Sequence, residues 1–125
     1  MAIISPAAYV KSFALIFGVY GLQMLAVPSK MVTDHFDAPS TPLLQFWIRG
    51  QSVSLLGLCY CVTKLPAEQG ALVSAVSSAA VGILYPWNAK FGYINKGLPV
   101  KYPMHYVPEV LMAGMTLGGV LALMN

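Results

Sequence analysis

The stretch LLQFWIRGQSVSLLGLCYCV, residues 43–62, decides the fold, because it is one apolar run interrupted by a single charge, Arg49. The hydrocarbon core of a bilayer is about 30 Å thick, and a helix that rises about 1.5 Å per residue needs about 20 mostly apolar residues to cross it. A charge at that depth is costly and is usually paired. The stretch therefore predicts a membrane-spanning helix and marks Arg49 as a residue that needs a partner.

The composition indicates the same surroundings for the whole chain. Hydrophobic residues make up 58% of it and charged residues 9%, whereas about a quarter of the residues of a soluble domain are charged. A chain of 125 residues has room for four or five spans and for no separate soluble domain. We expect an all-α integral membrane four-helix bundle, a single domain over residues 1–125, with spans at about 7–27, 43–62, 71–86 and 106–124.

Two longer loops, residues 28–42 and 87–104, should lie on one membrane face because two crossings, the second and third spans, separate them. A short turn is expected near Val32–Phe36, a tight connection over 64–70, and an end to the third span at Pro86. The long-loop face would hold four lysines, at 30, 90, 96 and 101, and the other face Lys11 and Lys64. The positive-inside rule then places the long loops toward the cytosol, stroma or matrix.

Several function classes are disfavoured by the sequence. Its seven basic and four acidic residues are spread along the loops, so no dense basic face for nucleic acid is expected. Residues 1–6 lack the basic segment of a signal peptide. Cys59 and Cys61 diverge by about 200° on a helix and are expected to be free thiols. No catalytic motif is present, and a solvated loop explains Asp34, His35 and Asp37, so we expect no enzymatic activity and no bound metal.

Small residues occur on every predicted span, which favours close helix packing in lipid. The positions expected to pack are Gly18, Gly21, Gly50, Ser54, Gly57, Ser74, Ser78, Gly82, Gly114 and Gly118. Cys61 extends the stripe on the second span. Ala71, Ala75 and Ala79 form a second small face on the third, and at least one of its two small faces could meet a partner subunit. The alternative is that glycine and alanine are simply common in membrane helices.

Glu109 is the acid that looks best placed to pair with Arg49, because both enter their helices from the long-loop face. Arg49 lies about 9 Å below that face, with Gln45 and Ser52 on the same side of its helix. We expect a structural ion pair that docks the second and fourth spans. A proton or ion site is the functional alternative, and a lipid phosphate or cofactor carboxylate is a third partner for Arg49.

Several interfacial side chains are candidates for contact with pigments or partners. They are His35, His105, Asn88, Trp87, Tyr93 and Tyr102. Histidine and asparagine can ligate the magnesium of chlorophyll, and aromatic rings suit the headgroup level. Neither histidine lies in a metal-binding spacing, and lone interfacial histidines are more often hydrogen-bonded surface residues. Chlorophyll or carotenoid, lipids and neighbouring membrane subunits are the expected contacts.

Two segments, GVYGLQMLAVP at 18–28 and LLQFWIRG at 43–50, carry a resemblance. The chain resembles a family of small four-helix membrane proteins of unknown function, in which the first helix ends at a proline and the second begins with an arginine–glycine pair, here Arg49 and Gly50. The likeness covers about residues 10–60 and implies four spans and no activity. The chain also looks like the accessory subunits that surround photosystem or respiratory cores in algae and protists.

These observations predict a non-catalytic accessory subunit of a larger membrane-embedded bioenergetic complex. A photosystem in the thylakoid is favoured, because the interfacial aromatics and single ligand residues suit pigment contact. One alternative is a mitochondrial respiratory or ATP synthase complex in the inner membrane. The other is a small homo-oligomeric carrier or channel that uses Glu109 and Arg49.

Overall fold

The structure is a computed structural model that describes residues 3–124, and all its regular elements there are helices. Four helices have 18 to 23 residues, which makes them about 27 to 35 Å long. They are α1 (Pro6–Ala26), α3 (Pro42–Lys64), α4 (Ala67–Leu84) and α6 (Tyr106–Leu123). The short helices α2 (Pro28–Thr33) and α5 (Pro86–Phe91) follow α1 and α4. The all-α prediction is confirmed.

Capping side chains and prolines define where the helices begin. The Ser5 side chain accepts a hydrogen bond from the Ala8 N–H at the start of α1, and Thr41 does the same for the Leu44 N–H of α3. Proline follows each of these caps, at a position whose N–H would have no partner within the helix. The sequence Ser-Pro or Thr-Pro therefore starts both helices.

Some predicted boundaries are wrong. The third span was expected over 71–86 after a tight connection over 64–70, but α4 begins at Ala67 and Gly70 lies within it. The expected loops over 28–42 and 87–104 each begin with a helix instead, α2 and α5. A proline ends the preceding helix, but it fits the first turn of a new one, so Pro28 and Pro86 change the direction of the chain without ending the helical structure.

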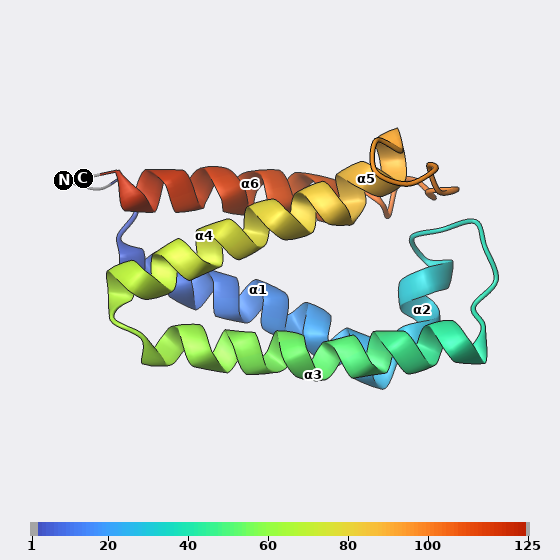
Figure 1. The fold of residues 1–125 in the computed structure, drawn as a ribbon, viewed down its shortest axis with the longest axis horizontal. Helices are drawn as coiled ribbons and strands as arrows, with labels where there is room; N and C mark the ends of the chain where they lie inside the picture. Colours follow the sequence, from blue (N-terminus) through green and yellow to red (C-terminus); the bar gives the residue numbers. More distant parts are fainter. Residues whose placement is uncertain (1–2, 125) are drawn as a thin grey trace.

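The helices form an elongated bundle in which α1 lies between α3 and α4, and α4 packs on α6 (Figure 1). Over the described residues, α3 and α6 make no contact with each other. The α3–α4 connection lies at one end of the bundle, and α2 and α5 lie at the other. There the two longer loops meet, because the Lys101 N–H donates to the His35 carbonyl at 2.8 Å and the Asp37 N–H to the Pro99 carbonyl at 2.7 Å. Their expected position at a common end is confirmed.

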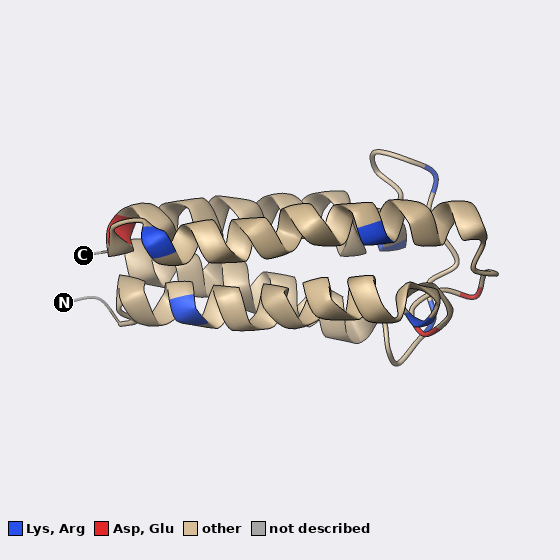
Figure 2. Cartoon of the chain, turned by 90° about the horizontal axis from the view of Figure 1, so that it is seen from below, with Lys and Arg blue, Asp and Glu red and all other residues tan. Residues whose placement is uncertain are grey.

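Three segments are long and apolar enough to span a membrane: α1, α4 together with α5, and α6. The helix α3 is not among them, although it is the longest, since it carries Gln45, Arg49 and Gln51. Charged residues lie toward the two ends of the bundle and leave its middle uncharged (Figure 2).

The core combines aromatic rings with small residues. Phe13 and Phe17 of α1 are stacked with their ring centroids 4.2 Å apart, and both are almost fully buried. The Tyr9 hydroxyl donates to the Met115 carbonyl at 2.8 Å and so joins α1 to α6. On α4 the buried residues are all small, namely Gly70, Ala71, Ser74, Ala75, Ser78 and Gly82. Small side chains therefore bring α4 close to its neighbours.

Candidate functional site

The most concentrated polar site surrounds the Glu109 carboxylate in the first turn of α6. Its Oε1 accepts from the Lys90 ammonium at 3.1 Å, and its Oε2 accepts from the Tyr102 hydroxyl at 2.8 Å. The same Oε2 lies 2.6 Å from Nδ1 of His105, one helical turn earlier. We call Lys90, Tyr102, His105 and Glu109 the Glu109 cluster.

Neighbouring elements hold this cluster in place. The helix α5 presents Lys90, and the Trp87 indole N–H donates to the Glu109 carbonyl at 3.2 Å, which ties α5 to α6. The chain after α5 turns at Gly92, whose φ of 65° is a left-handed conformation that suits glycine. The Asn88 side chain then accepts from the N–H groups of Ile94 and Asn95, at 2.9 and 3.2 Å. The return of the chain toward Tyr102 is therefore held by side-chain hydrogen bonds.

His105 connects the cluster to the loop between α1 and α3. The imidazole is only 2% exposed, and its ring lies edge-on to Phe36 and Tyr102, with centroid distances of 5.5 and 6.0 Å. With Glu109 as the acceptor, the Nδ1 atom carries the hydrogen. The buried imidazole thus links Phe36, Tyr102 and α6.

The Glu109 carboxylate is fully paired by the other side chains of the Glu109 cluster. Desolvation and the hydrogen bond to the Glu109 carboxylate raise the pKa of Tyr102, so its phenol stays protonated and donates. The carboxylate has one ammonium and two further donors as partners. Buried charges are stable when they are paired and hydrogen-bonded in this way. The arrangement therefore favours a structural role at the α5–α6 junction.

The expected Arg49–Glu109 ion pair is wrong. Arg49 lies on α3 and Glu109 on α6, and these helices do not contact each other within the described chain. The sequence placed both residues at similar depths, but depth does not determine which helices are neighbours. Lys90 takes the expected place of Arg49 because α5 carries it to the start of α6. The signal that could have indicated this helix is Pro86, since proline favours the first turn of a helix.

Arg49 instead faces outward. Its side chain is exposed, and Nε donates to the Leu25 carbonyl near the end of α1 at 3.3 Å. Within residues 3–124 no carboxylate lies at ion-pair distance from it. Arg49 and Gly50 line a groove of about 610 Å³ whose walls include Phe46 and Trp47. The guanidinium is therefore a cation that neighbours outside the chain can reach.

Five of the six expected pigment or partner contacts are occupied within the chain. His105 and Tyr102 bind Glu109, Trp87 binds its carbonyl, and Asn88 holds the following loop. The Tyr93 hydroxyl donates to the Ile83 carbonyl. His35 differs, because its Nδ1 lies 3.1 Å from the Met31 carbonyl and donates to it, which leaves the Nε2 lone pair for another partner.

The small residues divide into inner and outer positions. An added Cβ would clash with a neighbour at Gly21 and Gly82 and would touch Tyr9 at Gly118, while Ser74 and Ser78 are fully buried. The same atom would meet nothing within 4 Å at Gly18, Gly50, Gly57 and Gly114. The sequence did not single out Gly70 and Gly119, which are among the closest contacts: a Cβ would lie 2.7 Å from the Val62 carbonyl and 2.5 Å from the Ala75 Cβ, respectively.

Four small residues of α3 are all exposed on one side of the helix: Gly50, Ser54, Gly57 and Cys61. We call them the α3 outer stripe. They were expected to pack inside the bundle, which is wrong for this chain, because α3 turns Ser52, Cys59 and Val62 inward instead. Both small faces of α4, one of which was expected to be able to meet a partner, are largely buried, at Ser74 and Ser78 on one and Ala71 and Ala75 on the other. The helix α3 therefore presents a stripe of small exposed residues.

Comparison with protein-family models, curated proteins and solved structures yields no match to this chain. The resemblance over residues 10–60 therefore stays a prediction. In the described part of the chain, no group of three or more His, Cys, Asp and Glu side chains converges as a metal site would. Cys59 is buried and Cys61 exposed, and both are free thiols.

Proposed function

We propose that this chain is an integral membrane protein that serves, without catalysis, as a subunit of a larger membrane complex and binds a neighbouring subunit through α3. In this proposal all four long helices cross the bilayer. The single observation that carries the proposal is Arg49, an exposed cation beside the α3 outer stripe with no acidic partner among residues 3–124.

The burial pattern supports membrane insertion. On α4, Leu72 is 53% exposed and Val76 60%, whereas Ser74 and Ser78 are completely buried. In water the large aliphatic side chains would be buried and serine would be outside. In lipid, association relies on small residues at the helix contacts, while large aliphatic side chains face the hydrocarbon. The arrangement of α4 fits the second environment.

The polar character of α3 supports a protein neighbour. Arg49, Gln51 and Ser54 are exposed on the one long helix that is not apolar enough to be identified as a span. Exposed polar groups are costly within hydrocarbon, whereas at a helix contact they can bind another side chain. The small residues of the α3 outer stripe allow a second helix to approach closely. A transmembrane helix with a carboxylate opposite Arg49 satisfies both features.

The parent complex is proposed from His35 and the interfacial aromatic residues alone. A photosystem in the thylakoid is our preferred assignment, with chlorophyll or carotenoid from neighbouring subunits beside the interfacial aromatic residues. His35 supports pigment contact, because its free Nε2 is a suitable axial ligand. A mitochondrial respiratory or ATP synthase complex remains the alternative, and a visible absorption spectrum of the natively purified complex separates the two. Chlorophyll or carotenoid bands support the photosystem, and haem bands or no bands support the mitochondrion.

The carrier or channel alternative is disfavoured, because the gate that it proposed does not form within the chain. It required Arg49 and Glu109 to act together, but they lie on helices that do not touch, and Glu109 is bound by Lys90. Flux through proteoliposomes that Glu109→Gln abolishes would restore this alternative.

The test of the proposal is native gel electrophoresis of mildly solubilised membranes that contain the tagged chain. We expect the wild type, at 13.4 kDa, to migrate with a complex several times its own mass. Arg49→Gln and Gly57→Leu should each weaken binding to the complex about tenfold in Kd, the change that about 1.4 kcal/mol produces. Lys11→Gln, which also changes an exposed cation, is the matched control and should have no effect. Migration of the wild type as a monomer or homo-oligomer would overturn the proposal.

A further inference from the structure

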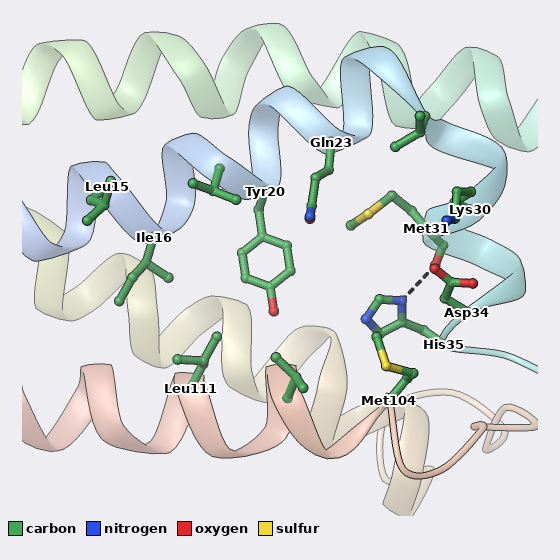
Figure 3. Close-up of a pocket in the computed structure, with 13 residues that line it drawn as sticks. Leu15, Ile16, Tyr20, Gln23, Lys30, Met31, Asp34, His35, Met104 and Leu111 are labelled. Carbon is green, nitrogen blue, oxygen red and sulfur yellow. Dashed lines mark hydrogen bonds between the residues drawn. The ribbon is translucent and has the colours of Figure 1, made fainter.

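A second groove lies between the latter half of α1, α2 and the start of α6 (Figure 3). It has a volume of about 520 Å³, within the range of about 300 to 1,000 Å³ that is usual for small-molecule sites. Its walls are mainly aliphatic and include Ile16 and Leu111. Leu15 and Val19 on its rim are 69% and 47% exposed, so the groove opens sideways to the surroundings.

Two polar groups face this groove without a partner. The Tyr20 hydroxyl and the Gln23 amide both point into it from α1, and neither is hydrogen-bonded to another of the lining residues drawn in Figure 3. Gln23 lies about 4.5 Å and Tyr20 about 9 Å below the end of α1 at Ala26. An unpartnered polar group at that depth in a bilayer costs free energy. A ligand that carries hydrogen-bonding oxygens just below its headgroup would remove that cost.

The mouth of the groove carries one charge of each sign. Lys30 and Asp34 both line it, and no ion pair joins them within 4 Å. Desolvation lowers the pKa of the third polar residue of the mouth, His35, although its hydrogen bond to the Met31 carbonyl opposes this effect. The imidazole is therefore neutral at pH 7. The charges available to a ligand are one ammonium and one carboxylate.

We propose that this groove binds one zwitterionic glycerophospholipid. Lys30 takes its phosphate and Asp34 its ammonium, the Gln23 amide and the Tyr20 hydroxyl donate to its ester carbonyls, and an acyl chain lies along Ile16 and Leu111. An anionic phospholipid fits less well, because its excess negative charge meets Asp34. This inference rests on the membrane insertion in the proposed function but not on the partner of α3.

The test uses purified protein equilibrated in vesicles of equal parts phosphatidylethanolamine and phosphatidylglycerol, followed by detergent extraction and native mass spectrometry. We expect about one retained phosphatidylethanolamine per chain, preferred over phosphatidylglycerol about fivefold. Tyr20→Phe and Gln23→Leu should each lower retention about fivefold. Asp34→Asn should abolish the headgroup preference while a lipid is still retained. Lys30→Gln should lower retention of both lipids. Lys64→Gln, which changes a lysine at the opposite end of the bundle, is its control and should leave retention unchanged.

Several results would overturn the inference. They are no retained lipid, equal retention of the two headgroups by the wild type, or no effect of Tyr20→Phe, a change that removes only the hydroxyl. A tetrapyrrole absorption band that His35→Ala abolishes would assign the groove to a pigment instead. Resistance to alkaline extraction from membranes reports insertion separately. If the chain is extracted, the proposed function fails as well, and if it is retained without lipid selectivity, only this inference fails.

Discussion

The Glu109 carboxylate on α6 is held by the Lys90 ammonium on α5, with Oε1 and Nζ 3.1 Å apart across 19 residues of chain. This contact joins the end of the third long segment to the start of the fourth. Because Tyr102 and His105 bind the other carboxylate oxygen, removal of Glu109 would leave three donors without their acceptor.

We predict that Glu109→Leu lowers the free energy of unfolding in detergent micelles by about 2–3 kcal/mol, the scale of losing hydrogen bonds to a charged group. Glu68→Leu is the control, since that acid is exposed at the opposite end of the bundle. Unfolding titrations followed by circular dichroism measure both variants. If Arg49→Leu destabilised the isolated chain as much as Glu109→Leu does, the assignment of Lys90 as the partner would be incorrect.

Alanine substitutions at Gly119 and Gly114 of α6 should change the free energy of unfolding in opposite directions. A Cβ at Gly119 would lie 2.5 Å from the Ala75 Cβ and 2.8 Å from the Tyr9 hydroxyl. Gly119→Ala should therefore lower the free energy of unfolding by about 1–3 kcal/mol through overpacking. Gly114→Ala meets nothing within 4 Å and should raise it by about 0.5–1 kcal/mol, because glycine weakens a helix interior. The same unfolding titration tests the pair, and equal effects would contradict the α4–α6 packing.

Ser74 and Ser78 are both fully buried on α4, but their hydroxyls differ in bonding. Ser78 donates to the Ser74 carbonyl at 2.8 Å and lies 3.4 Å from the Tyr9 hydroxyl, whereas the Ser74 hydroxyl has no partner among the described residues. Ser74→Ala should raise the free energy of unfolding by about 1 kcal/mol, and Ser78→Ala should lower it by about the same amount. Thermal unfolding of the two variants distinguishes them. A loss of stability in Ser74→Ala would reveal a partner for that hydroxyl.

The contact between the two loops should weaken in acid. Desolvation lowers the pKa of His35 from 6.5, the value of a free imidazole, so the unfolded chain binds a proton more readily than the folded one. Stability from this group is complete above about pH 6.5 and is lost as the pH falls through the lowered pKa. Asp34 favours the charged imidazole and His105 opposes it.

Comparison of the wild type with His35→Gln isolates this effect. Between about pH 7.5 and about pH 5, the free energy of unfolding should decrease more for the wild type than for His35→Gln. Only the wild type gains a proton at this position. Parallel changes in the two proteins would show that His35 does not contribute. Amide exchange at Lys101, whose N–H binds the His35 carbonyl, would locate the loss at the loop contact.

Local chemistry was readable in the sequence. Apolar runs of about 20 residues predicted long helices, and the structure has helices over the four predicted regions because a helix satisfies its own backbone hydrogen bonds. The shared end of the two long loops followed from the number of crossings alone. The helices depend on local sequence, and the shared end of the loops depends on the number of helices between them.

Only the tertiary structure decided which helices meet. The small residues of α3 and α4 give similar sequence patterns, but those of α4 are buried and the α3 outer stripe is exposed. Arg49 and Glu109 were expected at similar depths, yet α1 and α4 lie between their helices. A helical period specifies which residues share a face, but it does not specify what that face contacts. The partner of Glu109 and the outward position of Arg49 therefore depend on how the four helices are arranged around one another.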